Sequence, residues 1–243
     1  MIKEAIQHYK QSHGYSQFSP RCVLFDMDGV LYNSMPNHAV AWHEAMKQFD
    51  IHFTADDSYA TEGARGVDTI RKYVLEQQGK EISSEEAQRM YDVKTEIFHH
   101  MPIAEIFPGV IDIMQKIKSA GMTIGVVTGS GQRPLIKRLL NDFDGFLTED
   151  HIVTAYDVER GKPNPDPYLM GLRKTGNNNP WQGIVVENAP LGVRAGSAAN
   201  CFTIGINSGP LPDSALADNG ANIVLQQMTE LCSIWDELLQ NID

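Results

Sequence analysis

Two aspartates follow an apolar run early in the chain, in the stretch VLFDMDGVLYNS (23–34). Asp26 and Asp28 are separated by one residue, and like charges this close repel each other unless a cation lies between them. Two carboxylates at its end do not stabilise a buried strand. An Asp-Gly pair, however, is also common in surface turns. Taken alone, the pair leaves a surface turn and a functional site equally open.

Polar residues follow two further apolar runs in the same way. Thr128, Gly129 and Ser130 follow one run, and Glu187 and Asn188 follow the other. Neighbouring parallel strands share one edge at their carboxyl ends, and ligands bind there in open α/β sheets. Three unrelated turns would not be expected to carry this combination of carboxylates, hydroxyls and an amide, so the combined pattern favours a functional site.

The carboxylates in this set suit phosphoryl transfer. Asp26 and Asp28 offer the oxygen ligands that Mg²⁺ prefers, and Glu187 and Asn188 could complete the metal shell from the adjacent strand end. A carboxylate held in line with phosphorus can act as nucleophile and form an acyl phosphate. A second carboxylate two residues later can protonate the leaving oxygen and then accept a proton from the attacking water.

Phosphate oxygens also need hydrogen-bond donors and a cation. The N–H groups of the Gly29 turn and the hydroxyls of Thr128 and Ser130 are suited to phosphate oxygens. Lys162, in GKPNPDPYL (161–169), is the candidate cation that would spread the charge of the transition state. A lysine before a helix is usually a surface residue, so Lys162 gains this role only in combination with the other motifs.

Composition and charge limit the classes of partner. The chain has 243 residues and a net charge of −11, which makes nucleic acid and anionic membranes poor partners. Its three cysteines lie far apart, so neither a zinc site nor a disulfide framework is indicated. No signal-peptide pattern opens the sequence, and no apolar run approaches the ~20 residues of a membrane span. We therefore expect a reducing, cytoplasmic location, and no protein partner is indicated.

Short β-rich runs alternate with helical patterns from residue 22 onward. The six strand candidates cover residues 22–25, 123–127, 152–155, 183–186, 202–206 and 221–225. Near-continuous apolar strands that alternate with helices predict an α/β fold with a doubly wound parallel sheet. A short amphipathic helix is expected within residues 1–19, as an N-terminal extension.

Residues 35–104 interrupt this alternation. Three amphipathic helical patterns follow one another there, with no strand of comparable quality. Ser83 and Glu86 have the spacing of a capping box at the start of one of them. We predict an all-helical domain over 35–104, inserted after the first strand into a core made of residues 1–34 and 105–243.

Four motifs, taken together, resemble those of the haloacid dehalogenase superfamily of phosphotransferases and occur in the same order. They are DMDGVLYNS (26–34), VVTGSG (126–131), GKPNPDPY (161–168) and VVENAPLGV (185–193). The resemblance extends from about residue 23 to the end of the chain. It implies a Rossmann-like catalytic core, a helical cap at the predicted insert, and Mg²⁺ as the cofactor.

The resemblance also implies roles for the motif residues. Asp26 corresponds to the nucleophile and a metal ligand, and Asp28 to the general acid and base, which binds the metal through its backbone carbonyl. Thr128 would bind the transferred phosphoryl group, and Lys162 would steady that group. The last metal-binding pair falls at Glu187 and Asn188, with an amide where many relatives carry aspartate.

The branch of the superfamily that looks most similar is the β-phosphoglucomutase group, in which His38 matches a histidine at the cap hinge. A mutase must also grip a second phosphate, and in that group a lysine opens the corresponding cap stretch while another follows the core serine. Here these positions hold Glu62 and Gly131, although Arg65 adds some positive charge. We interpret Glu62 as a cap residue that reaches the metal, a pattern similar to that of a bacterial inorganic pyrophosphatase of the superfamily.

The sequence therefore predicts a Mg²⁺-dependent phosphohydrolase that acts through an aspartyl-phosphate intermediate on a small phosphate-containing substrate, with inorganic pyrophosphate favoured. The alternatives are a β-phosphoglucomutase or a sugar-phosphate phosphatase and, more remotely, a binding module without catalysis. The expected substrate-binding residues are Gly29, His38, Arg65, Gly129 and Ser130.

Overall fold

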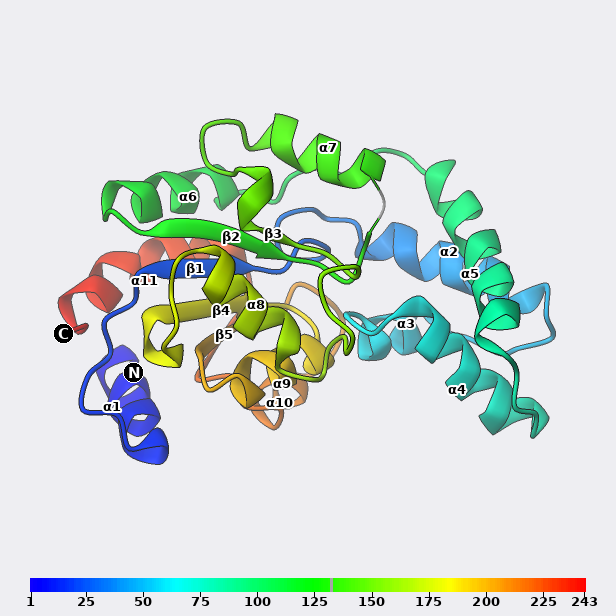
Figure 1. Cartoon of the computed structure of the whole chain (residues 1–243), viewed down its shortest axis with the longest axis horizontal. Helices are drawn as coiled ribbons and strands as arrows, with labels where there is room; N and C mark the ends of the chain where they lie inside the picture. The colour runs from blue at the N-terminus through cyan, green and yellow to red at the C-terminus, as the bar shows by residue number, and fades with distance from the viewer. Residues whose placement is uncertain (132) are drawn as a thin grey trace.

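The computed structural model describes residues 1–131 and 133–243, and its centre is a sheet of six parallel strands in the order β3-β2-β1-β4-β5-β6 (Figure 1). The strands are β1 Cys22–Phe25, β2 Thr123–Val127, β3 Ile152–Val153, β4 Gly183–Glu187, β5 Phe202–Ile206 and β6 Ile223–Leu225. All six lie within or next to the predicted segments. The predicted doubly wound α/β fold is confirmed.

The strand order places the carboxyl ends of three strands next to one another. The chain passes from β1 outward to β2 and β3, then returns to the other side of β1 with β4. Phe25, the last residue of β1, is therefore flanked by Val126 of β2 and Val186 of β4. Ligands of open α/β folds bind at such a reversal of strand order, and the polar residues that follow these strands meet there.

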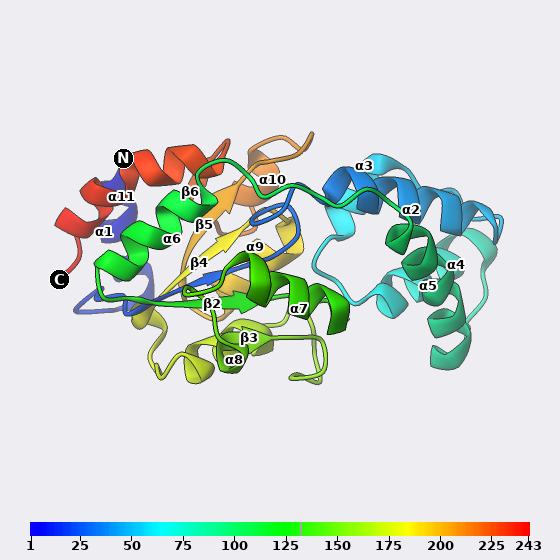
Figure 2. The ribbon, with the colours of Figure 1, turned by 90° about the horizontal axis from the view of Figure 1, so that it is seen from above.

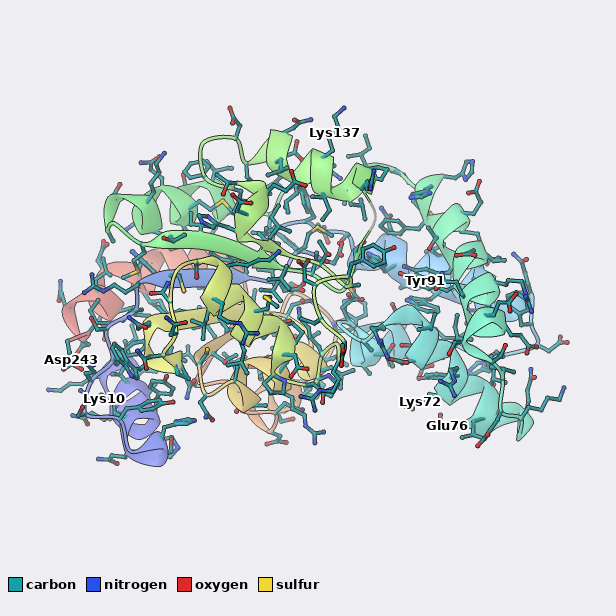
Figure 3. All side chains as sticks on the ribbon, in the orientation of Figure 1. Lys10, Lys72, Glu76, Tyr91, Lys137 and Asp243 are labelled. Carbon is teal, nitrogen blue, oxygen red and sulfur yellow. The ribbon has the colours of Figure 1, made fainter. Side chains whose placement is uncertain are left out.

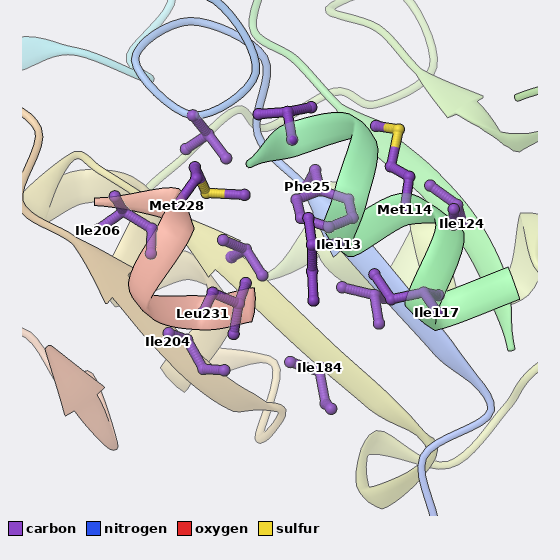
Figure 4. Packing of buried hydrophobic residues seen from close by; sticks show 14 of the residues in the cluster. Phe25, Ile113, Met114, Ile117, Ile124, Ile184, Ile204, Ile206, Met228 and Leu231 are labelled. Atoms are coloured by element: carbon purple, nitrogen blue, oxygen red, sulfur yellow. The ribbon is translucent and has the colours of Figure 1, made fainter. Parts of the chain in front are cut away.

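Helices cover both faces of the sheet because its strand residues are apolar on both sides. One face packs against α6 (Val110–Ser119) and α11 (Met228–Gln240), and Figure 4 shows Phe25 and Ile184 of the strands packed among side chains of these helices. The other face packs against α8 (Asp166–Lys174) and α9 (Pro190–Ala198). The remaining elements of this part are α7 (Arg133–Asp142), α10 (Ser214–Ala217) and the 3₁₀ turns η1 (Glu149–His151) and η2 (Pro180–Gln182).

A helical insert follows the first strand, as predicted. Its helices are α2 (Met35–Lys47), α3 (Ala55–Thr61), α4 (Gly66–Gln78) and α5 (Ser84–His99). They share a separate apolar cluster that includes Trp42, Phe53, Ile70 and Met90. In Figure 2 the strand arrows point toward this group of helices. We call residues 35–104 the cap and the rest of the chain the core, and we propose these bounds for the two domains.

The start of α5 differs in one detail from the prediction. The Ser83 hydroxyl accepts a hydrogen bond from the Glu86 N–H, which is one half of the expected capping box. A complete, reciprocal box lies at the start of α3, between Thr54 and Asp57.

Two connections join the cap to the core, and they lie side by side. The Asn33 N–H donates to the Glu105 carbonyl at 2.8 Å, and the Phe107 N–H donates to the Leu31 carbonyl at 3.0 Å. Because the connections are bonded to each other, the cap is attached along one narrow line, as a hinge requires.

The N-terminal extension forms α1 (Ile2–His13), with Ile2, Ile6 and Tyr9 on its buried face. Lys10 on this helix pairs with Asp243 at the other end of the chain, at 2.6 Å, and Figure 3 shows the two residues together. None of the described helices combines the length and the apolar composition that a membrane crossing needs.

Candidate active site

The predicted polar residues meet at the edge where β1, β2 and β4 end. Asp26 and Asp28 follow β1, Thr128 follows β2, and the last residue of β4 is Glu187. All four side chains are buried. The sheet topology therefore brings together residues that are up to 161 positions apart in the sequence.

Lys162 lies at the centre of this group, although it comes from the loop before α8. Its ammonium nitrogen is 2.5 Å from Asp26 Oδ1 and 2.7 Å from Glu187 Oε1, and it also donates to the Val127 carbonyl at 3.0 Å. Burial alone would lower the pKa of Lys162, but the two carboxylates outweigh it and hold the pKa above its usual value. Lys162 is thus a fixed cation, as its proposed role requires.

Glu187 does not have the free oxygens that we expected of a metal ligand. Its Oε1 accepts hydrogen bonds from Lys162 and from the Tyr168 hydroxyl, and its Oε2 accepts from the N–H groups of Asn188 and Ala189. The side chain is fully buried. All its acceptor sites are occupied by protein donors, so the geometry argues against direct metal binding and for a role in holding Lys162.

Two other oxygens fit a metal ion. Asp26 Oδ2 and Asn188 Oδ1 are buried, and neither has a hydrogen-bond partner in the described part of the chain. Buried acceptors without a partner are costly, and a hard cation would satisfy both. Burial raises the pKa of Asp26 despite the opposing charge of Lys162, and a cation at Oδ2 would favour its ionised form. The residues present therefore fit Mg²⁺, with the Asp28 carbonyl as a further proposed ligand.

The described residues contain no group of three or more His, Cys, Asp or Glu side chains that could hold a metal. Mg²⁺ does not need one, because it keeps several waters and commonly uses one or two carboxylates together with substrate phosphates. An amide oxygen and a backbone carbonyl can supply the remaining protein ligands.

Gly29 lets the loop after β1 approach Asn188. Its φ is +86°, and a Cβ atom at this position would lie 2.0 Å from Asn188 Nδ2. Any side chain here would displace the amide whose oxygen is a candidate metal ligand. The expected phosphate-binding turn after β2 is also ordered, because the Ser130 N–H donates to Thr128 Oγ1 at 3.0 Å.

The Asp28 carboxylate is contacted by the last residue before the cap and by a histidine of the first cap helix. The Ser34 hydroxyl donates to Asp28 Oδ1 at 2.6 Å, and His38 Nε2 lies 3.3 Å from the same oxygen. Burial would raise the pKa of Asp28, but His38 and Ser34 outweigh it and bring the pKa below its ordinary value. His38 therefore lies next to the site, where it faces the Asp28 carboxylate.

Lys94 is a site residue that we did not predict. Its ammonium nitrogen lies 2.7 Å from His38 Nδ1 and is buried among the rings of Trp42, Tyr91 and Phe98. Burial lowers its pKa to about 8, although nearby Glu62 and Asp28 oppose the shift. An ammonium group can only donate, so His38 Nδ1 is the acceptor and Nε2 carries the proton that faces Asp28.

A signal for Lys94 is present in the sequence. Met90, Lys94 and Phe98 are spaced by four residues, which places the lysine within the apolar stripe of α5. A lysine in the middle of such a stripe is unusual and calls for a partner.

Glu62 lies in the loop between α3 and α4 and faces the site, and its contact with a metal stays a prediction. It lines a cavity of about 40 Å³ together with Asp28, His38, Lys94 and the Thr128–Ser130 turn. Burial raises the pKa of Glu62, opposed by His38 and Lys94. The cap is closed over the core here, because the carbonyl of Gly63 lies against Gly129. Cap and core together therefore line a small polar cavity.

Arg65 is not placed as a substrate-binding residue. Its guanidinium pairs with Asp68 at 2.7 Å and donates to the Glu159 carbonyl at 3.1 Å, and it is absent from the lining of the Glu62 cavity. Arg71 and Lys72 are exposed and lie near the middle of α4, where Figure 3 labels Lys72. Helix α4 begins at Gly66, so these side chains face solvent while the loop before it faces the site.

Comparisons with known proteins agree with this geometry. Hexitol phosphatase A from Escherichia coli (strain K12) is 30% identical over 215 residues, covering 87% of this chain and 94% of that protein. Beta-phosphoglucomutase from Bacillus subtilis (strain 168) is 24% identical over 217 residues, covering 87% and 91%. A solved structure from Bacteroides vulgatus, provisionally named a beta-phosphoglucomutase, is 45% identical with a TM-score of 0.95 and covers 100% of this chain and 98% of its own.

The family model for haloacid dehalogenase-like hydrolases matches residues 23–206, from the first strand to the end of β5. This range contains the nucleophile candidate, the cap and all four motifs. The chain belongs to the haloacid dehalogenase-like hydrolase family and is an enzyme of its phosphatase and phosphotransferase type.

Proposed function

We propose that this enzyme is a Mg²⁺-dependent phosphohydrolase whose substrate is a small diphosphate, inorganic pyrophosphate in the first place. The observation that carries the proposal is the position of Glu62 in a cavity of about 40 Å³. A water needs at least ~10–15 Å³ of such volume, so the space beside Glu62, which is partly open to solvent, has room for only a few waters in this conformation. A carboxylate that faces phosphate repels it unless a metal lies between them.

The chain's own residues account for the reaction. Asp26 attacks phosphorus, the bond to the bridging oxygen breaks, and an aspartyl phosphate forms on Asp26. Asp28 is ionised in the free site because its pKa is low, so it must take up a proton as the substrate binds; it gives that proton to the departing oxygen and later takes one from the water that hydrolyses the aspartyl phosphate. Lys162 and the Thr128 hydroxyl hold the transferred group. Mg²⁺ bound by Asp26 and Asn188 would neutralise charge on the phosphate oxygens.

The His38–Lys94 pair would keep Asp28 in position through this cycle. Lys94 donates to one ring nitrogen of His38, so the other ring nitrogen presents its proton to Asp28. Both residues belong to the cap, and their orientation toward Asp28 therefore depends on cap position.

A sugar-phosphate phosphatase is the second candidate. Lys94 favours it, because a buried cation in the cavity could bind a second anionic or hydroxyl group of a larger substrate. The names of the relatives, hexitol phosphatase and beta-phosphoglucomutase, point in the same direction. A mutase is less well supported, because Arg65, Arg71 and Lys72 do not point into the cavity.

The test compares kcat/KM for pyrophosphate, hexose phosphates and a small aryl phosphate, in the wild type and in Glu62→Gln. We expect pyrophosphate to be the best substrate and Glu62→Gln to lower its kcat/KM by roughly 10–100-fold, as for a lost metal-shell contact. The aryl phosphate, which need not engage the cap, should change much less. Glu76→Gln is the matched control, because Glu76 lies at the outer end of α4 (Figure 3).

A preference for hexose phosphates over pyrophosphate in the wild type would overturn the pyrophosphatase assignment in favour of the second candidate. So would a Glu62→Gln variant with unchanged pyrophosphate hydrolysis.

A further inference from the structure

One arginine bridges the closed cap and the core outside the catalytic cavity. Arg65 Nη1 donates to the backbone carbonyl of Glu159 in the core at 3.1 Å. Its Nε and Nη2 donate to the two carboxylate oxygens of Asp68 in the cap, at 2.7 and 3.2 Å. Both edges of the guanidinium are therefore used, one for each domain.

On each side of this bridge, a side chain of one domain lies close to a glycine of the other. A Cβ atom at Gly161 would lie 3.0 Å from Arg65 Cγ, and a Cβ atom at Gly63 would lie 3.2 Å from Lys162 Cδ. Glycine at these two positions leaves space for the arginine stem and for the lysine. The Arg65–Glu159 contact is thus part of a closely packed interface between the cap loop 62–65 and the core loop 159–162.

The bridge joins the two loops that carry Glu62 and Lys162. Arg65 is three residues after Glu62, and Glu159 is three residues before Lys162. One hydrogen bond therefore links the loop of the cap carboxylate to the loop of the core cation. We propose that Arg65 is a positioning residue, a latch that holds the closed arrangement in which Glu62 and Lys162 serve the same phosphate. The inference rests on the proposed phosphohydrolase function only for the effect of Arg65 on the reaction rate.

The pairing with Asp68 prepares Arg65 for this role. Asp68 lies in the first turn of α4, and its N–H donates to the Arg65 carbonyl at 2.9 Å. Because both residues belong to the cap, their ion pair can persist when the cap opens. Only the hydrogen bond to Glu159 is then broken and remade, so little side-chain freedom is lost at each closure.

A surface ion pair between residues three apart usually contributes little to stability. The alternative is therefore that Arg65 and Asp68 form an ordinary surface ion pair at the start of α4, with no role in closure. The neighbouring pair of Arg160 and Asp166 provides the comparison. Arg160 donates to both oxygens of Asp166 at 2.8 Å, but both residues belong to the core. Arg160→Met therefore removes a similar pair without removing a link between cap and core.

The first test measures closure directly, by small-angle scattering with and without Mg²⁺ and orthovanadate, an unreactive phosphate analogue. The wild type and Arg160→Met should become more compact when these are added. Arg65→Met should keep the open profile over a larger part of the titration, with a melting temperature like that of Arg160→Met. Equal compaction in all three proteins would overturn the latch, as would an equal loss of melting temperature and activity in both variants.

The second test measures rate. We expect Arg65→Met to lower kcat/KM for the best substrate about tenfold, the effect of one hydrogen bond to a charged group at a half-exposed site. Arg65→Lys should recover part of the loss, because lysine can reach the Glu159 carbonyl but cannot bridge both partners. No recovery by lysine, or no loss in Arg65→Met, would contradict the proposal.

Failure of the latch and failure of the proposed function give different results. A wild type that compacts with Mg²⁺ and orthovanadate but does not cleave pyrophosphate refutes the substrate assignment, and the scattering comparison of variants still decides the latch.

Discussion

Replacing Glu187 by glutamine tests the role that its hydrogen bonds assign to it. The change keeps the shape of the side chain but turns one acceptor oxygen into an NH₂ group. That group must face either the two backbone N–H donors or Lys162 and the Tyr168 hydroxyl. In both orientations a donor meets donors, and Lys162 loses one of its two carboxylate partners.

The structure sets the size of the effect. Removing one partner of a buried ion pair costs about 3–5 kcal/mol. Lys162 still keeps Asp26 and the Val127 carbonyl, so we expect the lower end, about 3 kcal/mol of unfolding free energy. That is a large part of the roughly 5–15 kcal/mol that stabilises a typical domain. Turnover of every phosphate substrate should fall together, because Lys162 serves the transferred group whatever the leaving group is.

The assay is urea unfolding in a chelator, followed by Mg²⁺ titration of the folded protein. Asn188→Ala is the contrasting variant, because Asn188 Oδ1 has no partner to lose among the described residues. We expect Asn188→Ala to change apo-protein stability by about 1 kcal/mol or less and to weaken Mg²⁺ binding at least ~10-fold. Glu187→Gln should show the reverse pattern. If Glu187→Gln instead leaves stability intact and abolishes Mg²⁺ binding, Glu187 is a direct ligand and our reasoning fails.

Three further predictions concern the reaction. Asp26→Asn should lower activity at least ~10³-fold on every phosphate substrate, and retained turnover in a metal-saturated variant would rule out the covalent route. Lys94→Met should lower kcat/KM by roughly 10–100-fold without lowering the melting temperature, because methionine fills the apolar site while His38 loses its donor. A fall in melting temperature that matches the fall in activity would make Lys94 structural. Pyrophosphate in excess over Mg²⁺ should inhibit, and rates that stay constant as the metal is depleted would contradict a metal-bound substrate.

The sequence was sufficient to predict the sheet and the residues at its carboxyl edge. Strand residues such as Val185 and Ile204 are apolar and buried on both faces, so their runs stand out from amphipathic helices. Because parallel strands all end at one edge, the polar residues that follow them can be grouped from the sequence. Asp26, Thr128 and Glu187 are grouped in this way, whereas Lys162, in the loop before α8, is a candidate only in combination with the other motifs.

The roles of Glu187, Lys94 and Arg65 could not be assigned in the same way, because they depend on distances between loops. Glu187 precedes Asn188, a candidate metal ligand, in the sequence. Only the structure shows that four protein groups donate hydrogen bonds to the Glu187 oxygens and so occupy them. Lys94 lies on a cap helix 56 residues from His38, its partner. Arg65 was interpreted as a source of positive charge for the substrate, but the carbonyl it binds is 94 residues away.

The charges around the cavity connect these residues to the choice of substrate. The cap supplies one carboxylate, Glu62, and one ammonium group, Lys94, which is charged for the most part at neutral pH because its pKa is about 8. The core supplies Asp26, Asp28 and Glu187 against Lys162 alone, an excess of two negative charges that one divalent cation balances. Cap closure thus adds no net positive charge for a substrate that arrives as an anion. In the function that we propose, a diphosphate that carries its own Mg²⁺ would satisfy this balance, and Glu62 would meet that metal from the cap.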